Sequence, residues 1–118
     1  MKTKDLIVGL SQVYDEGRLR EIDFIDLKYP SLLERLTPIP LSTEILEKLG
    51  FEETKTDKVL YLSYTGLTLL VLDSIVDKEG KFYFSIKQDE QAIYMPVIRY
   101  LHELQQLIWV FFKKEVSV

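Results

Sequence analysis

The chain has 118 residues, of which 47% are hydrophobic and 29% are charged, and its formal net charge is −4 at pH 7. These values predict one globular domain over residues 1–118 and exclude intrinsic disorder. Because the chain has no cysteine, disulfide scaffolds, thiolate nucleophiles and cysteine-based zinc sites are excluded, and the acidic balance argues against a long nucleic acid as a partner.

The first residues predict a β-hairpin. Asp5–Tyr14 alternates loosely and is rich in Leu, Ile and Val, which favours a strand. Asp15–Gly17 is an acidic turn whose glycine can take the positive φ that a bulged hairpin loop requires. We therefore expect Arg18–Leu27 to return as the second strand.

The segment after this hairpin has little regular structure in the prediction. Ser31–Leu36 has room for one short helical turn. Thr37–Pro40 contains two prolines, and each proline fixes φ and lacks a backbone N–H. This second part is therefore expected to be irregular.

A short helix is predicted over Thr43–Leu49, with signals at both ends. Ser42 is a good N-cap, and Glu44 places a negative charge in the first turn, where the helix dipole favours it. Gly50 follows the helix as a residue suited to positive φ, and Phe51 can pack back as in a Schellman ending.

Three more strands are predicted in the second half of the chain, separated by turns that contain glycine. Alternation in the last strand places Phe82, Phe84 and Ile86 on its buried side. The strands are expected over Val59–Tyr64, Leu67–Ile75 and Lys81–Lys87, with turns at Thr65–Gly66 and Asp77–Gly80 and a loop at Asp89–Gln91.

The last apolar stretch, Val97–Phe112, predicts a helix, and Pro96 can start it at the first position, where the missing N–H costs nothing. Apolar residues recur there at three- and four-residue steps, as on one face of a helix. Leu107–Phe112 is apolar all the way round. A helix end of this kind must be buried on more than one side.

This apolar helix end predicts a contact with another chain. We expect Ile108 and Phe111 to pack on the sheet of their own chain. Trp109 and Phe112 then face outward and are the predicted interface residues, because large exposed apolar patches usually mark contacts. The expected partner is a second copy in a homodimer or larger homo-oligomer, and a two-fold dimer is the commonest solution.

The order of the predicted elements indicates an α+β fold. Acidic turns that end in glycine, placed between apolar runs, favour antiparallel hairpins over βαβ units. We therefore expect a twisted, mostly antiparallel sheet with a short middle helix and a long C-terminal helix packed on it.

Three segments together carry a resemblance that spans most of the chain. They are Val8–Gly9 in the opening hairpin, the block Pro38–Phe51 (PIPLSTEILEKLGF) and the late helix segment Tyr100–Gln105 (YLHELQ). In this order they resemble uncharacterised small proteins of phages and mobile elements from Bacteroides-type bacteria, which share a PIPLT-x-E-I-L-x-K-x-G-F block and a late Y-x-H-x-L-Q helix. The apolar run Leu107–Phe112 departs from that pattern. The resemblance implies an accessory protein of a phage or mobile element and assigns no activity to any residue.

No residue pattern in the chain predicts catalysis. His102 is the only histidine, and its neighbour Glu103 points elsewhere on a helix, so we expect His102 to have a structural role. The glycines are scattered singly, which excludes a glycine-rich phosphate loop, and the carboxylate pairs do not follow EF-hand spacing. We therefore predict a non-enzyme without catalytic residues, cofactor or metal site. The carboxylate pairs are Asp23 and Asp26, Asp73 and Asp77, and Asp89 and Glu90.

The aromatic residues around the predicted sheet suggest a second kind of site. Tyr83, Tyr94 and Tyr100 are candidates for stacking on a small nucleotide, with Lys81 and Lys87 nearby in the sequence. The alternative is that these rings fill the faces of the sheet and a subunit interface.

The leading hypothesis is a non-enzymatic binding or interaction protein that acts through a self-associating apolar surface. The alternative is a small-ligand binder that sequesters a nucleotide signal and thereby antagonises host antiviral defence, and a small hydrolase with an unrecognised site comes third. A deep pocket lined by Tyr, Arg and Lys would favour the ligand binder, whereas a flat apolar patch would favour the interaction protein.

The expected location is the cytoplasm of the bacterial host, with no membrane partner. The apolar run Leu6–Leu10 is too short for a signal peptide. A membrane-spanning helix needs about 20 apolar residues, and Arg99 and Glu103 interrupt the C-terminal stretch.

Overall fold

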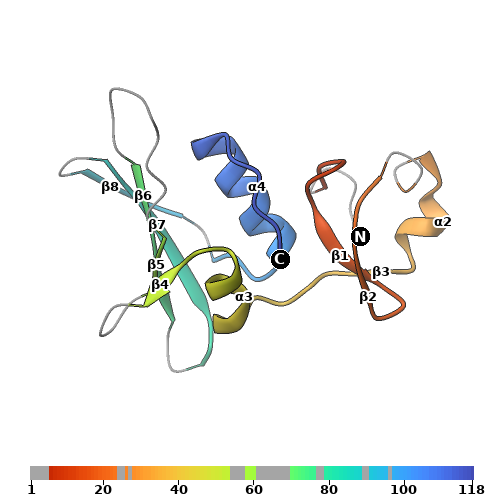
Figure 1. Ribbon diagram of the computed structural model, residues 1–118, viewed down its shortest axis with the longest axis horizontal. Coiled ribbons are helices and arrows are strands. Elements are labelled where there is room, and N and C mark those ends of the chain that lie inside the picture. The colour runs from red at the N-terminus through yellow and green to blue at the C-terminus, as the bar shows by residue number, and fades with distance from the viewer. Residues whose placement is uncertain are drawn as a thin grey trace. The chain divides into compact units, whose positions relative to one another are not determined.

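The computed structural model describes residues 6–23, 26, 28–53, 58–60, 70–76, 79–88, 91–95 and 97–118 (Figure 1). The fold is α+β, as predicted, but the described strands are divided between two antiparallel sheets. One sheet has the strand order β2-β1-β3 and the other the order β4-β5-β6-β7-β8. The chain forms two compact units, one of Met1–Leu41 with Tyr100–Val118 and one of Ser42–Arg99. The expectation of one domain over residues 1–118 stays a prediction.

The first unit contains the predicted N-terminal hairpin. Glu16 and Gly17 form its loop with φ angles of 51° and 83°, and the flanking residues Asp15 and Arg18 pair directly. Positive φ at both central residues is typical of a type I′ turn. The turn is therefore confirmed, without the expected bulge. The strands are β1 (Gln12–Asp15) and β2 (Arg18–Glu21).

The first strand begins later than predicted, because the residues before it form a turn. Gly9 has a φ of 78°, and the backbone N–H groups of Leu10 and Ser11 both donate to the carbonyl of Ile7. The Ser11 hydroxyl accepts a further hydrogen bond from the Ile7 N–H at 2.8 Å. The prediction of a strand over Leu6–Leu10 is wrong for this reason.

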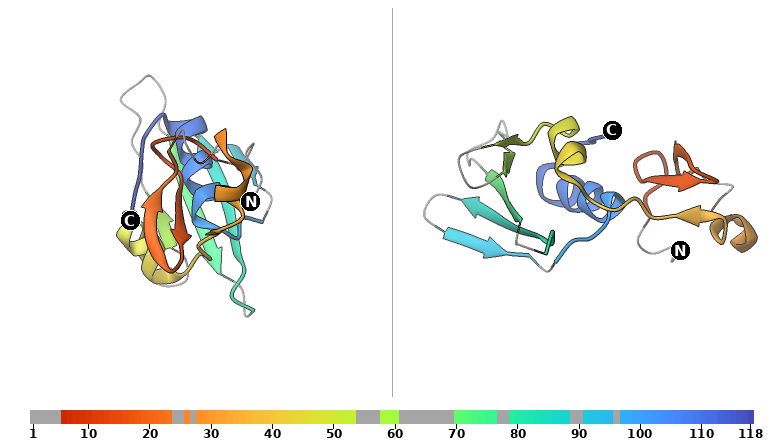
Figure 2. Two further views of the ribbon diagram at one scale, coloured as in Figure 1. Left: turned by 90° about the vertical axis from the view of Figure 1, so that its right-hand side faces the viewer. Right: turned by 90° about the horizontal axis from the view of Figure 1, so that it is seen from below.

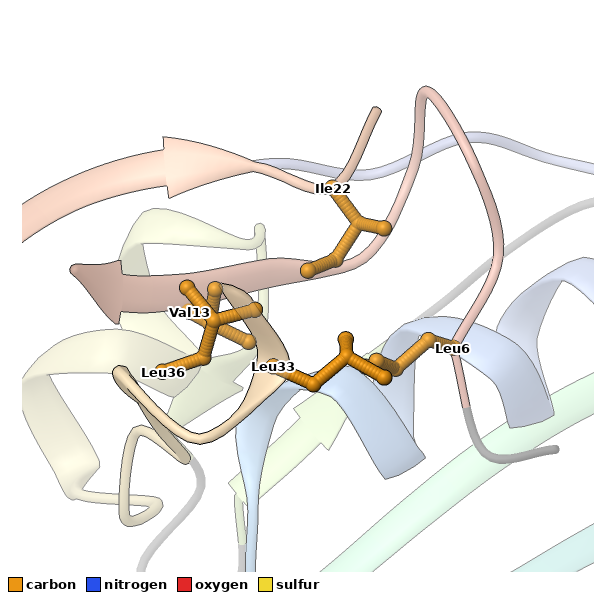
Figure 3. Packing of buried hydrophobic residues seen from close by; sticks show 5 residues of the cluster. All are labelled: Leu6, Val13, Ile22, Leu33 and Leu36. Atoms are coloured by element: carbon orange, nitrogen blue, oxygen red, sulfur yellow. The ribbon is translucent and has the colours of Figure 1, made fainter. Parts of the chain in front are cut away.

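A short helical turn and a short strand complete this part of the first unit. The expected turn is confirmed as α2 (Pro30–Leu33). The strand β3 (Leu36–Thr37) pairs with β1 and was not predicted. A cluster of buried aliphatic side chains forms between these elements and the hairpin. The cluster consists of Leu6, Val13, Ile22, Leu33 and Leu36 (Figure 3).

The C-terminal helix belongs to the same unit and starts later than the sequence indicates. α4 (Leu101–Phe112) begins after Tyr100, whose backbone is extended and whose N–H donates to the Glu103 carboxylate at 3.1 Å. Ile98 and Tyr100 each take part in an isolated antiparallel bridge. The predicted start near Val97 is therefore wrong, and Pro96 lies outside the described residues.

Two buried glutamines fasten α4 and the C-terminal segment to β1. The Gln105 side chain accepts from the backbone N–H of Gln12 at 2.8 Å and donates to the Gln12 side-chain carbonyl at 3.0 Å. Gln105 also donates to the carbonyl of Val116 at 2.9 Å, and the N–H of Val118 donates to the Gln12 side chain at 2.7 Å. Every partner of Gln105 is thus a polar group of β1 or of the segment after the helix.

The short helix of the second unit forms as predicted. In α3 (Thr43–Lys48), the Ser42 hydroxyl accepts from the N–H of Ile45 at 3.2 Å. Gly50 has a φ of 106°, and the N–H of Phe51 donates to the carbonyl of Leu46 at 2.9 Å. These are the contacts of a serine N-cap and a Schellman ending.

Both ends of α3 can be tested by substitution. Ser42→Ala removes the acceptor for a helix N–H and is expected to lower the free energy of unfolding by about 1 kcal/mol. Gly50→Val is expected to cost more, because a β-branched residue tolerates positive φ poorly. Urea denaturation followed by circular dichroism measures both values. A negligible loss for both variants would contradict the assigned ends of this helix.

The five-stranded sheet is antiparallel throughout, and its last strand was not predicted. Phe82, Phe84 and Ile86 are buried on one face, as expected. Gln91, expected in a loop, is the first residue of β8. The turn Thr65–Gly66 and the residues Asp89 and Glu90 lie outside the described part of the chain. The strands are β4 (Glu52–Glu53), β5 (Lys58–Leu60), β6 (Leu70–Val76), β7 (Phe82–Gln88) and β8 (Gln91–Tyr94).

Candidate functional site

The two faces of the five-stranded sheet differ in burial over β6 and β7, whereas β8 is exposed on both faces. Leu72 pairs with Ile86 on the buried face. The ring of Phe84 on this face makes an edge contact with Phe51, with 6.2 Å between ring centroids. Side chains of a strand alternate between faces, so the neighbours of these residues lie on the opposite side.

The exposed side of these strands, here called the outer face, carries apolar and aromatic side chains. Ile75 pairs with Tyr83 across β6 and β7, and Ser85 pairs with Tyr94 across β7 and β8. The exposed fractions are 49% for Ile75, 41% for Tyr83 and 83% for Tyr94. The structure thus places two of the three predicted stacking residues on one face. The outer face consists of Val71, Asp73, Ile75, Tyr83, Ser85, Lys87, Ala92 and Tyr94, of which Ser85 is buried and Val71 and Asp73 are partly exposed.

The charges of the outer face are paired with each other. Lys87 on β7 contacts the carboxylate of Asp73 on β6, with 2.5 Å between nitrogen and oxygen. Asp73 is largely shielded from solvent, whereas Lys87 is exposed. A phosphate group bound on this face would need the positive charge of Lys87, but the Asp73 carboxylate already balances that charge.

Tyr100, the third predicted stacking residue, belongs to the first unit. Its ring stacks on the imidazole of His102, with centroids 5.9 Å apart and planes 7° apart. His102 is buried. The structure therefore gives Tyr100 an aromatic neighbour in its own unit.

The end of α4 differs from the prediction at its last two residues. Ile108 is fully buried, as expected, but Phe112 is 4% exposed and Phe111 is 36% exposed. The expectation that Phe111 packs inward and Phe112 faces outward is therefore wrong, because Phe112 shares the buried face of the helix. Trp109 is partly exposed, and the Lys113 ammonium lies 5.8 Å from the centroid of its ring.

The edge of the five-stranded sheet at β8 is a feature that sequence reasoning missed. All four residues of this strand are exposed. Ile93 is 56% exposed although its cross-strand neighbour Ile86 is buried. β8 follows β7 at the end of the sheet, as the ribbons show (Figure 2, right). Its sequence, Gln-Ala-Ile-Tyr, does not alternate between apolar and polar residues.

A cluster of charged side chains in the first unit has a structural explanation. Arg20 binds both carboxylate oxygens of Asp26, at 2.8 and 2.5 Å, and its third nitrogen donates to Asp15 at 2.8 Å. Asp26 is buried and also accepts from the N–H of Asp23 at 2.8 Å. The hydrogen bonds from Arg20 lower the pKa of Asp26 to about 2 and also lower the pKa of Asp15.

This cluster predicts a loss of stability in acid. The pKa of Asp26 is lower in the folded than in the unfolded chain, so its ion pair stabilises the fold above about pH 4 and loses this effect as the pH falls toward 2. We expect Asp26→Asn to be less stable at pH 7 and to depend less on pH between 4 and 2. Urea denaturation at several pH values measures both effects. Parallel pH profiles for the variant and the unmodified protein would contradict the assignment.

The described residues can be checked for a metal site and for a membrane-spanning helix. Within them, no three side chains of histidine, cysteine, aspartate or glutamate lie so that they could hold a metal ion. No helix in the described ranges has the length and the apolar character needed to cross a membrane.

Comparisons with known proteins give one partial similarity. No protein-family model and no solved structure matches the chain. The chain is 34% identical over 65 residues to methionyl-tRNA formyltransferase of Corynebacterium jeikeium (strain K411). The match covers 55% of this chain and 20% of the formyltransferase, so the chain spans about a fifth of that protein.

Proposed function

We propose that the protein is a non-enzymatic binding protein that associates with itself through exposed apolar side chains. The observation that carries this proposal is the group of exposed apolar residues on adjacent strands at one end of the five-stranded sheet. This group consists of Ile75, Tyr83 and Tyr94 on the outer face and of Ile93 on the opposite face, at the β8 edge.

The chemistry of this group favours a protein partner. Large exposed apolar patches on soluble proteins usually mark contacts, and tyrosine is enriched in protein interfaces. Because Lys87 is neutralised by Asp73, the outer face offers apolar contact more than charge attraction. A second copy of the chain can cover such a surface, so that no other protein is needed as a partner.

The end of α4 supports the same proposal with a corrected set of residues. Val110 and Phe111 are exposed and Trp109 is partly exposed, whereas Phe112 is buried. Trp109 thus remains a predicted interface residue, and Phe111 takes the place of Phe112. This second apolar surface lies in the other unit of the chain.

The biological setting rests on the resemblance to small phage and mobile-element proteins, carried by the Pro38–Phe51 block and the Tyr100–Gln105 segment. We place the protein, as part of this proposal, in the cytoplasm of a bacterial host as an accessory protein. The formyltransferase activity belongs to the matched protein, of which this chain spans about a fifth, and is not part of the proposal.

A small-ligand binder is the second candidate. It is favoured by the positions of Tyr83 and Tyr94, whose exposed rings share one face of the sheet and could stack on a nucleobase. The Lys87–Asp73 ion pair weakens this reading, since the lysine charge is already balanced. Titration with ATP and with cyclic dinucleotides, followed by tyrosine fluorescence, tests it. Saturable quenching that Tyr94→Ala abolishes would favour the ligand binder.

Sedimentation velocity of the unmodified protein tests the proposed self-association. We expect the average mass to rise from 13.9 kDa, the mass of one chain, toward a multiple of it as the concentration increases. A mass of one chain up to high micromolar concentration would contradict the proposed function.

A further inference from the structure

β8 is the last strand of the five-stranded sheet, and no strand among the residues that the structure describes pairs with its outer edge. Natural proteins commonly protect such edges with lysine, proline or a covering segment. β8 contains no charged residue and no proline, and all four of its residues are exposed. An edge with these properties is suited to pairing with another strand.

The register identifies the backbone groups that point outward from this edge. The N–H of Met95 donates to the carbonyl of Phe84 on β7 at 2.9 Å. In an antiparallel pair, residues two apart direct their N–H and C=O groups to the same side. Ile93 therefore also faces β7, whereas Ala92 and Tyr94 direct their backbone groups to the open edge.

A second copy of β8 can satisfy these outward groups in one symmetric register. When Ile93 lies opposite Ile93 of the second copy, Ala92 of each copy lies opposite Tyr94 of the other copy. Both pairs are then hydrogen-bonded pairs, and every outward N–H and C=O of the strand has a partner. The register centred on Tyr94 would instead place Ala92 opposite Pro96, which has no N–H to donate.

The side chains suit the same register. Leu72, Ile86 and Ile93 form one cross-strand row on the buried face, and the row ends in the exposed Ile93. In the register described, the two Ile93 side chains form a non-hydrogen-bonded pair, in which side chains approach most closely. On the outer face, the large Tyr94 lies opposite the small Ala92. No two like charges meet between the paired strands, although each chain carries a net charge of −4.

We propose that two copies of this chain associate by antiparallel pairing of β8 with β8, centred on Ile93, so that their five-stranded sheets become one continuous sheet. This inference rests on the proposed self-association and gives it a site and a partner.

Charge substitutions at the centre of the paired strands test the register. Ile93→Lys and Ile93→Glu each place like charges opposite one another, and each variant alone is expected to sediment as one chain. An equal mixture of the two variants is expected to regain the mass of two chains, because unlike charges then meet. Leu19→Lys is the matched control: it charges a similarly exposed aliphatic side chain on β2, in the other sheet and outside the proposed apolar surfaces, and its association should be unchanged.

Ala92→Pro gives a second, independent variant. It removes an N–H that points outward and leaves the hydrogen bonds from β8 to β7 intact, so far-ultraviolet circular dichroism should be unchanged while association is lost. If the unmodified protein associates and both Ile93→Lys and Ala92→Pro keep the mass of two chains, the β8 pairing is wrong and self-association uses another surface. If the unmodified protein stays a single chain, both the pairing and the proposed function are overturned.

Discussion

Replacement of Gln105 by leucine is expected to lower the free energy of unfolding by about 3 kcal/mol, because each buried polar group left without a partner costs roughly 1–3 kcal/mol. Gln105 is fully buried and bonds to the backbone N–H of Gln12 and to the carbonyl of Val116. Leucine has a similar size, but it has no acceptor for the Gln12 N–H and no donor for the Val116 carbonyl. Urea denaturation followed by circular dichroism measures the loss.

The neighbouring residue provides the control for this prediction. Gln106→Leu makes the same chemical change on the same helix at a partly exposed position, and it is expected to change stability by less than about 0.5 kcal/mol. Equal losses for the two variants would show that Gln105 stabilises the helix only through its own propensity. A loss at Gln105 alone would support the connection between α4, β1 and the C-terminal segment.

Phe84→Ala should destabilise the second unit by about 3–5 kcal/mol, the usual range for removing a buried phenylalanine. Phe84 is 2% exposed and its ring contacts that of Phe51. The substitution leaves a cavity between the sheet and the segment that follows α3. Thermal denaturation monitored by circular dichroism provides the measurement.

Tyr83→Ala is the matched control for this core substitution. Tyr83 is the preceding residue of the same strand and lies on the outer face. Its loss is expected to cost less than about 1 kcal/mol, because surface substitutions usually have small effects. A larger effect at Tyr83 than at Phe84 would reverse the assignment of the two faces of the sheet.

The parts of the fold that the sequence predicted are those with local chemical signals. Ser42 and Gly50 determine the ends of α3 through an N-cap and a positive φ, and both effects act within a few residues. The turn at Glu16 and Gly17 was predicted for the same reason. Such signals require no knowledge of distant contacts.

The buried face of α4 was not predicted correctly because one polar residue belongs to it. Successive residues of a helix are about 100° apart, so Phe112 lies about 20° from Leu101 around the helix axis and Phe111 about 80° from it. The fully buried Gln105 moves the centre of the face toward Phe112. The sequence pattern counted Gln105 as a polar residue, and only its contacts with Gln12 and Val116 explain its burial.

The open edge of the sheet was missed because β8 has no strand pattern of its own. Its four residues are exposed on both faces, so no alternation between buried and solvated positions marks the strand. Pairing with β7 alone establishes it as a strand. Tyr83 and Tyr94 were identified as candidate site residues from their residue type, but their common face follows from the register of β7 and β8.

Amide hydrogen exchange of the unmodified protein, measured by nuclear magnetic resonance at low and high protein concentration, tests the pairing of β8 most directly. The amides of Ala92 and Tyr94 point to the open edge, and we expect their exchange to slow as the concentration rises. The amide of Ile93 points toward β7 within the same chain, and its exchange should depend much less on concentration. Exchange at Ala92 and Tyr94 that is equally fast at both concentrations would contradict the association of two chains through this strand.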